Sequence, residues 1–534
     1  MRHGVVGLVV VLIAAIGPVT LSAGATRSTP GRAVGSQAFL RTTPPGGPQA
    51  RGGSIKVLQF GSSGQWTSLD PGTQTYIGAA APLFAAVFGG LFEQTSTGTV
   101  VPVMAASYDE SADAKTFTIH LHPGMTFSDG TPFNSAAVKW NFERDLGSSS
   151  TCVCVVNFPI QSIDTPDDAT VVLNLTRPFP AMIDAFAGEA PDFIASPTAY
   201  QRLGASTFQL KPVGAGPFEV VTDQSNYKLA LKRNPRYWQP GHPYLNNLTF
   251  LTVGNEISAY GGLVNHEGDV LTGYSDFTQV AAASKLANVY QIAGVTPITI
   301  QFNTMIPPFN NLKAREAILY ATNLQAINKG LFKGLAVMTQ SPTGPGGLFF
   351  EPTVPGTLTF NLAKARQLVH QLGGLSVILP ANTPGKIQVN PVLQNLTFNI
   401  AEALQEQWGK AGIKTSLFSS KTGTPATIGS CGSYDPATGV GLGFCFGDTA
   451  ATSNIHDPQL IQMIANAATI SDQTARAQAY QAIFVYINQN AYAVFLGLPP
   501  AYLLTTRQVR WPVNEPGLLA PPSTEYWENV SVKS

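Results

Sequence analysis

Charged side chains are scarce in this sequence. Asp, Glu, Lys and Arg make up 12% of its 534 residues, whereas about 25% is typical of a soluble domain. The 31 basic residues equal the 31 acidic residues in number, so the formal net charge is zero. Nucleic-acid binding needs a basic face, and the composition therefore argues against it. An apolar content of 44% predicts a large folded core rather than a disordered chain.

Motifs of the common enzyme classes are missing as well. No Gly-x4-Gly-Lys-Ser/Thr sequence is present, so any ATP hydrolysis would belong to another chain. The segment 61–64, GSSG, follows an expected strand but lacks the G-x-S-x-G spacing of a nucleophilic serine. His266 and Glu267 begin like a zinc-protease helix, but no second histidine stands four residues after the first. We therefore expect no enzyme activity and no cofactor.

A pair of histidines raises the question of a metal. His120 and His122 lie two residues apart in an expected strand, which places both imidazoles on one face. Two ligands do not make a metal site, and the sequence indicates no third ligand. Solvent-facing histidines are the simpler interpretation, and we expect no metal.

The first 25 residues are typical of an export signal. Arg2 precedes an apolar run over residues 5–16, and an A-x-A motif at residues 23–25 offers a cleavage site. The alternative is an uncleaved anchor, because residues 5–25 could almost span a bilayer. Residues 26–53 are rich in Pro, Gly, Ser and Thr, which predicts a disordered linker. The chain is therefore expected to be exported to the periplasmic or cell-envelope space and soluble after cleavage.

Four cysteines in an exported chain suggest disulfide bonds, and four allow three connectivities. Cys431 and Cys445 flank a Gly-rich loop and are the easier pair to join. Cys152 and Cys154 are separated by one residue, so a bond between them would be strained, and they either form it or stay reduced. The pattern does not favour zinc, since the sequence has no C-x-x-C pair.

The stretch 116–140, TFTIHLHPGMTFSDGTPFNSAAVKW, predicts a compact strand–turn–helix unit. Apolar residues alternate with polar ones from Phe117 to Leu121, as in a half-buried strand. Two turn sequences, Pro-Gly and Asp-Gly, follow. Thr131-Pro132 can begin the helix, because proline is tolerated in a first turn.

This stretch resembles the signature of the bacterial extracellular solute-binding proteins of family 5, the peptide-, nickel- and oligosaccharide-binding subunits of ABC importers. The sequence departs from the family pattern at Ala137, where Asp is usual, and at His122, where Arg is common. The matching residues are Phe117, Leu121, Gly124, Phe127, Ser128, Asp129, Gly130, Pro132, Phe133 and Val138. Similar elements follow along nearly the whole mature chain, among them LDP at 69–71, LFE at 91–93, GAGPF at 214–218 and NPRYW at 234–238.

The resemblance implies an α/β protein with the two-lobe, type II periplasmic-binding-protein fold of cluster C, in which hinge strands join the lobes and an extra domain is present. Alternation of expected strands and helices favours the same α/β class. Lobe I is expected to be discontinuous and to precede and follow the extra domain II, whereas lobe II (domain III) is continuous. The expected bounds are 1–25 for the signal peptide, 26–53 for the linker, 54–90 with 208–299 and 500–534 for lobe I, 91–207 for domain II, and 300–499 for lobe II.

The resemblance also implies a function as the substrate-binding component of an ABC importer. Such a protein captures a small solute between its lobes, here an oligopeptide by first expectation, and delivers it to transmembrane permease subunits as a monomer. Other ligands in this class are an oligosaccharide, a metal chelate or a lipid-like molecule. Alternatives of other classes are a secreted hydrolase or peptidase, whose catalytic residues are not found, and a surface interaction protein that has lost its permease. No cysteine follows the signal, so a lipid anchor is not expected.

Four residues are candidate ligand contacts. In peptide-binding relatives an aspartate shortly after an aromatic-Cys step pairs with the peptide's amino group, and Asp448 matches that position, with Phe446 beside it. A buried carboxylate needs a cation, which a ligand ammonium would supply. Alternatively Asp448 caps its loop, and Asp457 is then the next candidate, although it also fits a helix start. Trp66 and Tyr274 follow expected strands near glycines and are candidates to line the cleft, although a lone aromatic residue is more often part of the core.

Overall fold

The structure is a computed structural model that describes part of the chain. The described residues are 51–60, 66–74, 77, 80–94, 99–147, 158–276, 279–292, 294–380, 391–418, 426–430, 434–438, 441–446, 455–512, 518–519 and 527–533. The expected signal peptide and nearly all of the expected linker lie outside these residues, as do Asp448, Cys152, Cys154 and Cys431.

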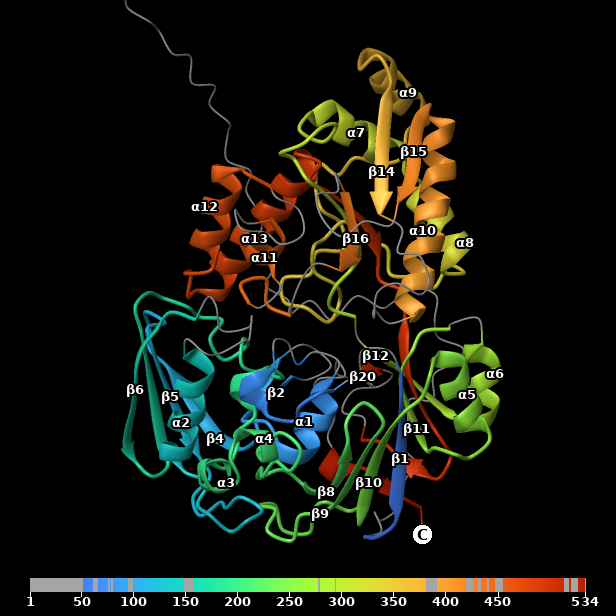
Figure 1. Cartoon of the computed structure of the whole chain (residues 1–534). Helices are drawn as coiled ribbons and strands as arrows, with labels where there is room; N and C mark the ends of the chain where they lie inside the picture. The colour runs from blue at the N-terminus through green and yellow to red at the C-terminus, as the bar shows by residue number, and fades with distance from the viewer. Residues whose placement is uncertain are drawn as a thin grey trace, which may run out of the picture. The chain divides into compact units, whose positions relative to one another are not determined.

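An eight-stranded sheet surrounds the first core. Its strands are β1 (Ser54–Gln59), β8 (Phe218–Gln224), β9 (Lys228–Arg233), β10 (Asn247–Thr252), β11 (Val270–Tyr274), β12 (Asn288–Ile292), β18 (Ala501–Thr505) and β20 (Leu518–Leu519). Their spatial order is β20-β12-β18-β11-β1-β10-β9-β8. The sheet packs with α1 (Ala81–Phe88), α5 (Glu256–Val264) and α6 (Val280–Leu286), and Figure 1 shows α5 and α6 side by side. Val57, Leu248 and Phe250 are fully buried in it.

A four-stranded antiparallel sheet has a core of its own. Its strands are β4 (Ala105–Glu110), β5 (Thr116–Leu121), β6 (Ile160–Asp167) and β7 (Thr170–Leu175), in the order β4-β5-β7-β6, and α2 (Ser135–Leu146) packs on β6 and β7. Phe117, Ile119 and Leu121 are buried and the residues between them are half-buried, which confirms the alternating strand expected here. The hairpin of β2 (Phe92–Gln94) and β3 (Val100–Pro102) precedes this sheet, and the short helices α3 (Pro197–Leu203) and α4 (Ala205–Phe208) follow it.

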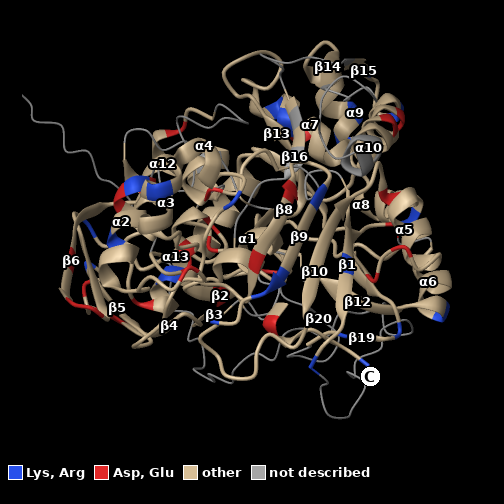
Figure 2. Cartoon of the chain, turned by 60° about the horizontal axis from the view of Figure 1, so that its bottom comes forward, with Lys and Arg blue, Asp and Glu red and all other residues tan. Residues whose placement is uncertain are grey.

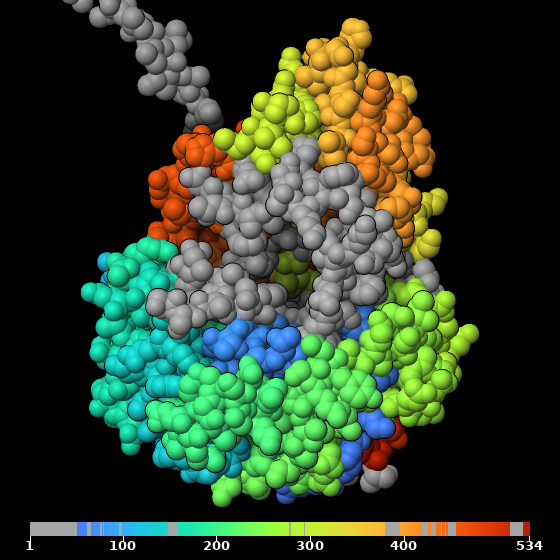
Figure 3. Space-filling model, in the orientation of Figure 1, coloured from blue at the N-terminus to red at the C-terminus, as the bar shows by residue number. Residues whose placement is uncertain are grey.

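The C-terminal part contains two further sheets. β13 (Ile298–Phe302) lies between β16 (Ala426–Ser430) and β17 (Ala493–Gly497) and is antiparallel to both. β14 (Leu375–Pro380) and β15 (Ile413–Phe418) run parallel and are connected by α10 (Pro391–Lys410), which packs on β15. The other helices are α7 (Leu312–Ala321), α8 (Leu324–Leu331), α9 (Leu362–Gln371), α11 (Leu442–Phe446), α12 (Pro458–Ala467) and α13 (Gln473–Gln489). In Figure 3 the surfaces of α7 (yellow-green) and of the β14–α10–β15 unit (orange tones) adjoin.

Two short segments connect the eight-stranded and three-stranded sheets. The chain passes from β12 to β13 through residues 293–297 and returns from β17 to β18 through residues 498–500. The lobe boundary expected at 299/300 falls inside β13, and the one expected at 499/500 falls inside the second connection. A small pair of strands, β19 (Val509–Arg510) and β21 (Ser531–Val532), completes the C-terminus.

The helix expected from Thr131-Pro132 begins later than the sequence suggested. α2 begins at Ser135, because the Asn134 side chain accepts a 3.1 Å hydrogen bond from the Ala137 N–H and caps the helix. Pro132 instead forms a β-bridge with Thr126. The proline thus belongs to the turn that precedes the helix.

The largely apolar run 79–92 predicts a helix, and the observed helix is shorter. α1 ends at Phe88, because Gly89 has a φ of 66° and turns the chain, and Phe92 already belongs to β2. Apolar residues at helical spacing also predict helices over residues 363–372 and 473–487, and the run 413–418 predicts a strand. These predictions are confirmed as α9, α13 and β15.

Charge is sparse and mixed throughout the described elements. Figure 2 shows lysines and arginines interspersed with aspartates and glutamates, and most of the ribbon is uncharged. None of the helices described has both the length and the apolar character needed to cross a membrane.

Candidate functional site

The two connections between the sheets are bonded to one further segment, residues 337–346. Val337 and Leu498 exchange two backbone hydrogen bonds of 2.9 Å, and the Gly344 N–H donates to the Val295 carbonyl at 2.8 Å. A Cβ atom at Gly344 would lie 2.6 Å from the Gly294 carbonyl oxygen, so the close approach requires glycine. Both connections are therefore held by the same backbone framework.

Buried hydroxyl groups order that supporting segment. Thr339, Ser341 and Thr343 are at most 3% exposed. The Ser341 N–H donates to Thr339 Oγ1 at 2.9 Å, and the Ser341 and Thr343 hydroxyls are 3.1 Å apart. Asn488 of α13 donates to the Gln340 carbonyl at 3.0 Å. Because these polar groups satisfy one another, the segment is fixed without contributing a charge.

The loop on which Asp448 stands is anchored on both sides. Phe446, at the end of α11, is 0% exposed, and Ile455 is 1% exposed. Both belong to one core cluster with Cys445 and with Phe484 of α13. Asp448 itself lies outside the described residues, so its contact with a ligand amine stays a prediction. The buried residues Phe446 and Ile455 therefore flank the segment that contains Asp448.

Asp457, the second candidate for an amine contact, has a structural role. Its Oδ1 accepts hydrogen bonds from the Gln459 and Leu460 N–H groups at 2.9 and 3.2 Å and thereby caps α12. Its Oδ2 accepts from the hydroxyls of Tyr486 and Tyr492 at 2.9 and 2.5 Å. Burial alone would raise the pKa of Asp457, but these hydrogen bonds outweigh burial and lower it. Of the two expectations for this residue, the helix start is confirmed.

The three aromatic candidates lie in the core. Trp66 is 2% exposed, and its indole N–H donates to Asp223 Oδ1 at 2.8 Å. Tyr274 is 1% exposed and stacks on Tyr260 with ring centroids 5.4 Å apart. Phe446 is fully buried, as noted above. These positions favour packing over ligand contact, which was the alternative interpretation for Trp66 and Tyr274.

The structure brings together a buried polar cluster that no pattern in the sequence indicates. Arg476 of α13 donates through Nη2 to Asp435 Oδ1 at 2.7 Å, and both side chains are at most 6% exposed. The negative charge of Asp435 also acts on Asp184, from the segment after β7. The Arg476 guanidinium also lies over the rings of Phe349 and Tyr480, 5.4 and 5.6 Å from their centroids. The cluster thus joins the chain around the four-stranded sheet to the C-terminal part.

Burial and neighbouring charges shift the pKa values of several groups in this cluster. Burial, and then the charge of Asp435, raise the pKa of Asp184 well above its usual range. Burial also raises the pKa of Glu110 in β4. Burial opposes the charge of Arg476, but Asp435 more than compensates and raises the pKa of the guanidinium. The Arg476 guanidinium therefore interacts electrostatically with several carboxyl groups.

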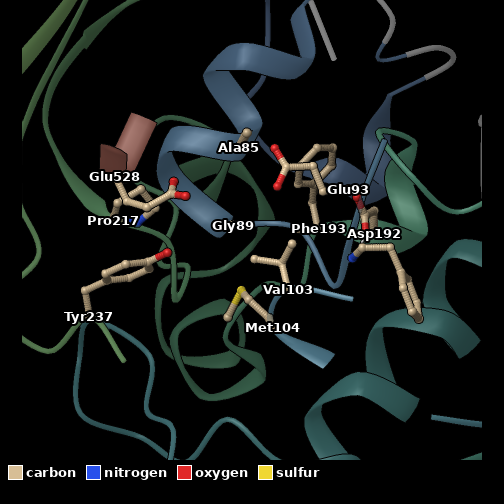
Figure 4. A pocket seen from close by; sticks show the side chains of 12 residues that line it. Ala85, Gly89, Glu93, Val103, Met104, Asp192, Phe193, Pro217, Tyr237 and Glu528 are labelled. Atoms are coloured by element: carbon tan, nitrogen blue, oxygen red, sulfur yellow. Dashed lines mark hydrogen bonds between the residues drawn. The ribbon is translucent and has the colours of Figure 1, made fainter. Parts of the chain in front are cut away.

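A small cavity lies at the C-terminal end of α1. Figure 4 shows Glu528 and Tyr237 on one side of it and Glu93 and Asp192 on the other. The space that the centres of water molecules can occupy in this cavity is about 40 Å3. This is room for about three waters and is too small for a peptide. Burial raises the pKa of Asp192 to about 7 and that of Glu528 to about 7.

Residues of three elements that resemble the family pattern meet at this cavity. Glu93 belongs to LFE, Pro217 to GAGPF and Tyr237 to NPRYW. They pack around the end of α1 together with Asp192, which accepts hydrogen bonds from the Phe92 and Gly188 N–H groups at 2.9 Å each. These elements therefore serve the packing of the fold at this point.

The two histidines of β5 and its C-terminal end make separate contacts. His120 Nε2 lies 3.0 Å from Asp109 Oδ2, and the His122 ring stacks on Trp238 with centroids 4.3 Å apart. Across the described ranges, no three His, Cys, Asp or Glu side chains are grouped so that they could hold a metal ion.

A comparison of the sequence with protein families decides the class. The profile of the bacterial extracellular solute-binding proteins, family 5 Middle, matches residues 99–432, which is more than half of the chain. The chain belongs to this family. The resemblance inferred from the stretch 116–140 is thereby confirmed.

Curated relatives of this family 5 protein include the glutathione-binding protein GsiB. The chain is 31% identical over 322 residues to GsiB of Escherichia coli O1:K1 / APEC, which is 59% of this chain and 61% of the relative. GsiB of Salmonella typhi gives the same identity and the same coverage. The match thus spans about 61% of the length of these relatives.

Solved structures confirm the fold of this family 5 protein. HbpA2 from Haemophilus parasuis has a TM-score of 0.74 at 23% identity, covering 90% of this chain and 100% of that one. The oligopeptide-binding protein AppA from Bacillus subtilis has a TM-score of 0.73 at 15% identity, covering 91% and 100%. NikA from Staphylococcus aureus has a TM-score of 0.71 at 16% identity, covering 90% and 100%. The expected α/β, type II binding-protein fold is therefore confirmed.

Proposed function

We propose that this protein is the substrate-binding component of an ABC importer, which captures a small solute between two lobes and delivers it to a membrane permease. One observation carries the proposal: in a chain of solute-binding family 5, two sheets with separate cores are connected by two short segments, 293–297 and 498–500. A ligand that contacts both lobes favours their closed arrangement, which the permease then recognises. Lobe I comprises 54–90, 208–299 and 500–534, lobe II 300–499, and the extra domain 91–207.

The proposed ligand is an oligopeptide. This class is supported by relatives named for glutathione binding and by similar structures solved with the peptide STSA and with a nonapeptide. A non-peptide ligand is the second candidate, because AgaA was solved with agropinic acid and NikA with Ni(L-His)2.

Asp448 is the proposed partner of the ligand's amino group. Its loop runs between Phe446 and Ile455, which are buried in one cluster, so the loop ends are fixed. The neighbouring carboxylate, Asp457, already accepts four hydrogen bonds. A carboxylate–ammonium hydrogen bond is charge-assisted and holds a peptide N-terminus in one orientation. In this proposal the ligand-facing loops are supported by packing against three buried aromatic residues, Phe446, Trp66 and Tyr274.

Native mass spectrometry of the purified mature protein tests the proposal. Heterogeneous adducts with peptide-like masses, lost on partial unfolding, would support oligopeptide capture. A single discrete non-peptide mass would contradict it and identify the other ligand class. Asp448→Asn should weaken binding of a recovered peptide about tenfold or more, because hydrogen bonds to charged groups contribute about 1.5–3 kcal/mol. Glu402→Gln, on the exposed face of α10, is the matched control and should leave affinity unchanged.

The alternative from another class, a secreted hydrolase or peptidase, is tested in the same samples. Incubation with a recovered peptide should return the peptide at its original mass if the protein is a binder. Fragments whose masses sum to that peptide plus water would support the hydrolase instead.

Export and maturation complete the proposal. The protein is proposed to be exported as a monomer without a lipid anchor, its signal removed after residue 25. Cys431 is proposed to pair with Cys445, which is 1% exposed in the core cluster that also contains Phe446 and Ile455. N-terminal sequencing of the secreted protein tests the cleavage site, and a start at Met1 would support the uncleaved anchor.

A further inference from the structure

A buried ion pair fixes one short segment of the proposed lobe II. Asp435 is 0% exposed, and Arg476, near the start of α13, is 5% exposed. Arg476 Nη2 lies 2.7 Å from each oxygen of the Asp435 carboxylate. The guanidinium also lies over the rings of Phe349 and Tyr480, which restrict it from the other sides. The Asp435 side chain is therefore held against α13.

Asp435 in turn orders the segment in which it lies. Its Oδ1 accepts a hydrogen bond from the Ala437 N–H at 2.8 Å. Its carbonyl oxygen accepts from the N–H and the hydroxyl of Thr438 at 3.0 Å each. The Leu348 N–H donates to the Tyr434 carbonyl at 2.8 Å, at the other end of the segment. Both ends are thus held by hydrogen bonds.

The same segment is bonded directly to α11. The Leu442 N–H donates to the Pro436 carbonyl at 2.9 Å, and the Gly441 N–H donates to the Thr438 carbonyl at 2.7 Å. A Cβ atom at Gly441 would lie 2.4 Å from the Pro436 carbonyl oxygen, so the two pieces of backbone are in close contact. The start of α11 therefore depends on the segment that the ion pair orders.

The segment also lies between two cores. Tyr434 and Ala437 pack against the core cluster of the four-stranded sheet, which belongs to the proposed domain II. Ala437 packs in addition against the cluster that contains Leu442 and Phe446 of α11. Side chains on both sides of Asp435 thus contact the four-stranded sheet domain, while the backbone between them supports α11.

We propose that the Asp435–Arg476 ion pair is a positioning device for ligand capture, through which the packing of domain II determines where α11 lies. α11 ends at Phe446, two residues before Asp448, the proposed partner of the ligand's amino group. The inference rests on the proposed function, because that contact is the one whose position is set. It gives domain II a part in ligand affinity, although none of the proposed ligand contacts lies in residues 91–207.

A buried ion pair is suited to positioning. The loss of water from both charges offsets much of their attraction, so the pair contributes little net stability, whereas removal of one partner leaves a costly buried charge. A neutral pair should therefore restore stability without restoring the geometry. Asp435→Asn combined with Arg476→Met gives such a pair, because asparagine can still accept from the Ala437 N–H and methionine can pack on the aromatic rings.

Urea unfolding, calorimetric titration with a peptide recovered from the wild type, and hydrogen exchange of the ligand-free mature protein test the proposal. The single variant Asp435→Asn should lose both stability and affinity. In the double variant, stability should return toward that of the wild type while affinity stays about tenfold lower, within the range of effects known for residues remote from a ligand. Amides of α11 should exchange faster in the double variant, with those of α12 unchanged.

Asp472→Asn is the control on the same helix, because the exposed N-cap of α13 keeps a capping oxygen and all measurements should match the wild type. Affinity that returns together with stability in the double variant would show that the pair is only structural and would overturn the proposal. Unchanged exchange in α11 would overturn it as well.

A second variant keeps the test decisive if the double variant does not fold, as judged by circular dichroism. Gly441→Ala leaves the ion pair intact but forces α11 away from the Pro436 carbonyl, and it should weaken binding of the recovered peptide. Gly443→Ala, in the same helix, meets no atom within 4 Å and should bind as the wild type does. Equal affinities of these two variants would refute the positioning of α11.

Failure of this proposal is distinguishable from failure of ligand capture. A wild-type protein that binds no solute would refute the proposed function, whereas the exchange measurement needs no ligand and still shows whether the pair positions α11. A wild type that binds peptide, with a double variant of equal affinity, would leave capture standing and remove only the positioning role.

Discussion

Trp66 Nε1 lies 2.8 Å from Asp223 Oδ1, and this hydrogen bond attaches the chain after β1 to β8. The indole is 2% exposed and belongs to the core of the eight-stranded sheet. Trp66 was a candidate ligand contact, yet its polar atom is directed to a protein carboxylate. The bond therefore distinguishes a packing role from a binding role.

Replacement of Trp66 by Phe should lower stability while leaving ligand affinity unchanged. The variant removes the donor and leaves a partly buried Asp223 oxygen without this partner, at a cost of about 1–3 kcal/mol. Urea unfolding and calorimetric titration with a recovered ligand measure the two effects. Tyr227→Phe, at a residue that is 62% exposed, is the neutral control. Loss of affinity with unchanged stability would assign Trp66 to the binding surface after all.

The glycine between the two connections gives a second prediction. Gly344→Ala places a Cβ atom 2.4 Å from Leu498 Cδ2 and 2.6 Å from the Gly294 carbonyl oxygen. The backbone must shift, so we expect a loss of about 1–3 kcal/mol in unfolding free energy together with weaker ligand binding. Gly330→Ala in α8 meets no atom within 4 Å and should be neutral or slightly stabilising. Equal behaviour of the two variants in urea would contradict the close approach.

Asp145 should make the protein less stable as pH rises toward neutrality. It is 1% exposed, neither carboxylate oxygen accepts a hydrogen bond from a described residue, and Arg144 Nε is 3.7 Å away. Burial exceeds the attraction of Arg144, which pairs with Asp70 at 2.9 Å, and raises the pKa of Asp145 to about 7. The folded state therefore binds a proton that the unfolded state has lost, and stability falls between about pH 4 and pH 7.

The Asp145→Asn variant measures this effect. We expect it to be more stable than the wild type above pH 7, on the order of 2 kcal/mol, and similar to it near pH 4. Thermal melts at pH 4, 6 and 8 provide the comparison, and Asp168→Asn serves as an exposed control. A variant that is less stable at pH 8 would show that the charge of Asp145 is needed by Arg144.

The cap of α12 has the opposite pH dependence. The pKa of Asp457 is lowered in the folded protein, so its contribution to stability is present above the unfolded pKa and is lost as pH falls through the folded one. Asp457→Ala should cost about 0.5–2 kcal/mol at pH 7. Asp457→Asn keeps a capping oxygen and should cost less, with a smaller difference between pH 7 and pH 3. Equal costs for both variants in urea unfolding would show that the cap contributes little.

The disulfide is tested by counting thiols. Alkylation of the denatured, unreduced mature protein should leave Cys431 and Cys445 unmodified, and peptide mapping should recover them joined. Reduction should then lower the unfolding free energy by about 2–4 kcal/mol. Alkylation of Cys445 without prior reduction would contradict the pairing.

The sequence predicted local structure well, because local structure depends on neighbouring residues. The alternation from Phe117 to Leu121 determines a strand without distant partners. Gly412, with a φ of 84°, likewise follows the end of α10 at Lys410, where a glycine commonly ends a helix. α2 was placed a few residues early, because Asn134 competes with Thr131-Pro132 as the helix start and the capping hydrogen bond decides between them. The family signature then supplied the architecture that local patterns alone do not specify.

The site was harder to predict, since its contacts are distant in sequence. Asp435 and Arg476 are brought together by tertiary packing, and no spacing in the sequence relates them. Trp66 and Tyr274 follow strands, as cleft residues do, but alternation cannot tell an inward-facing aromatic residue from one beside a ligand. In the folded chain both side chains are buried in the core, and their contact with a ligand stays a prediction.

The position of β18 sets the order in which the chain can be assembled. This strand is formed by residues 501–505, yet it lies inside the eight-stranded sheet between β11 and β12, which are formed by residues 270–274 and 288–292. β17, at residues 493–497, completes the other sheet in the same way beside β13. A polypeptide emerging from its N-terminus thus leaves both sheets unfinished until nearly the whole chain has been made. Neither sheet can therefore complete its backbone hydrogen bonding before the C-terminal residues are available.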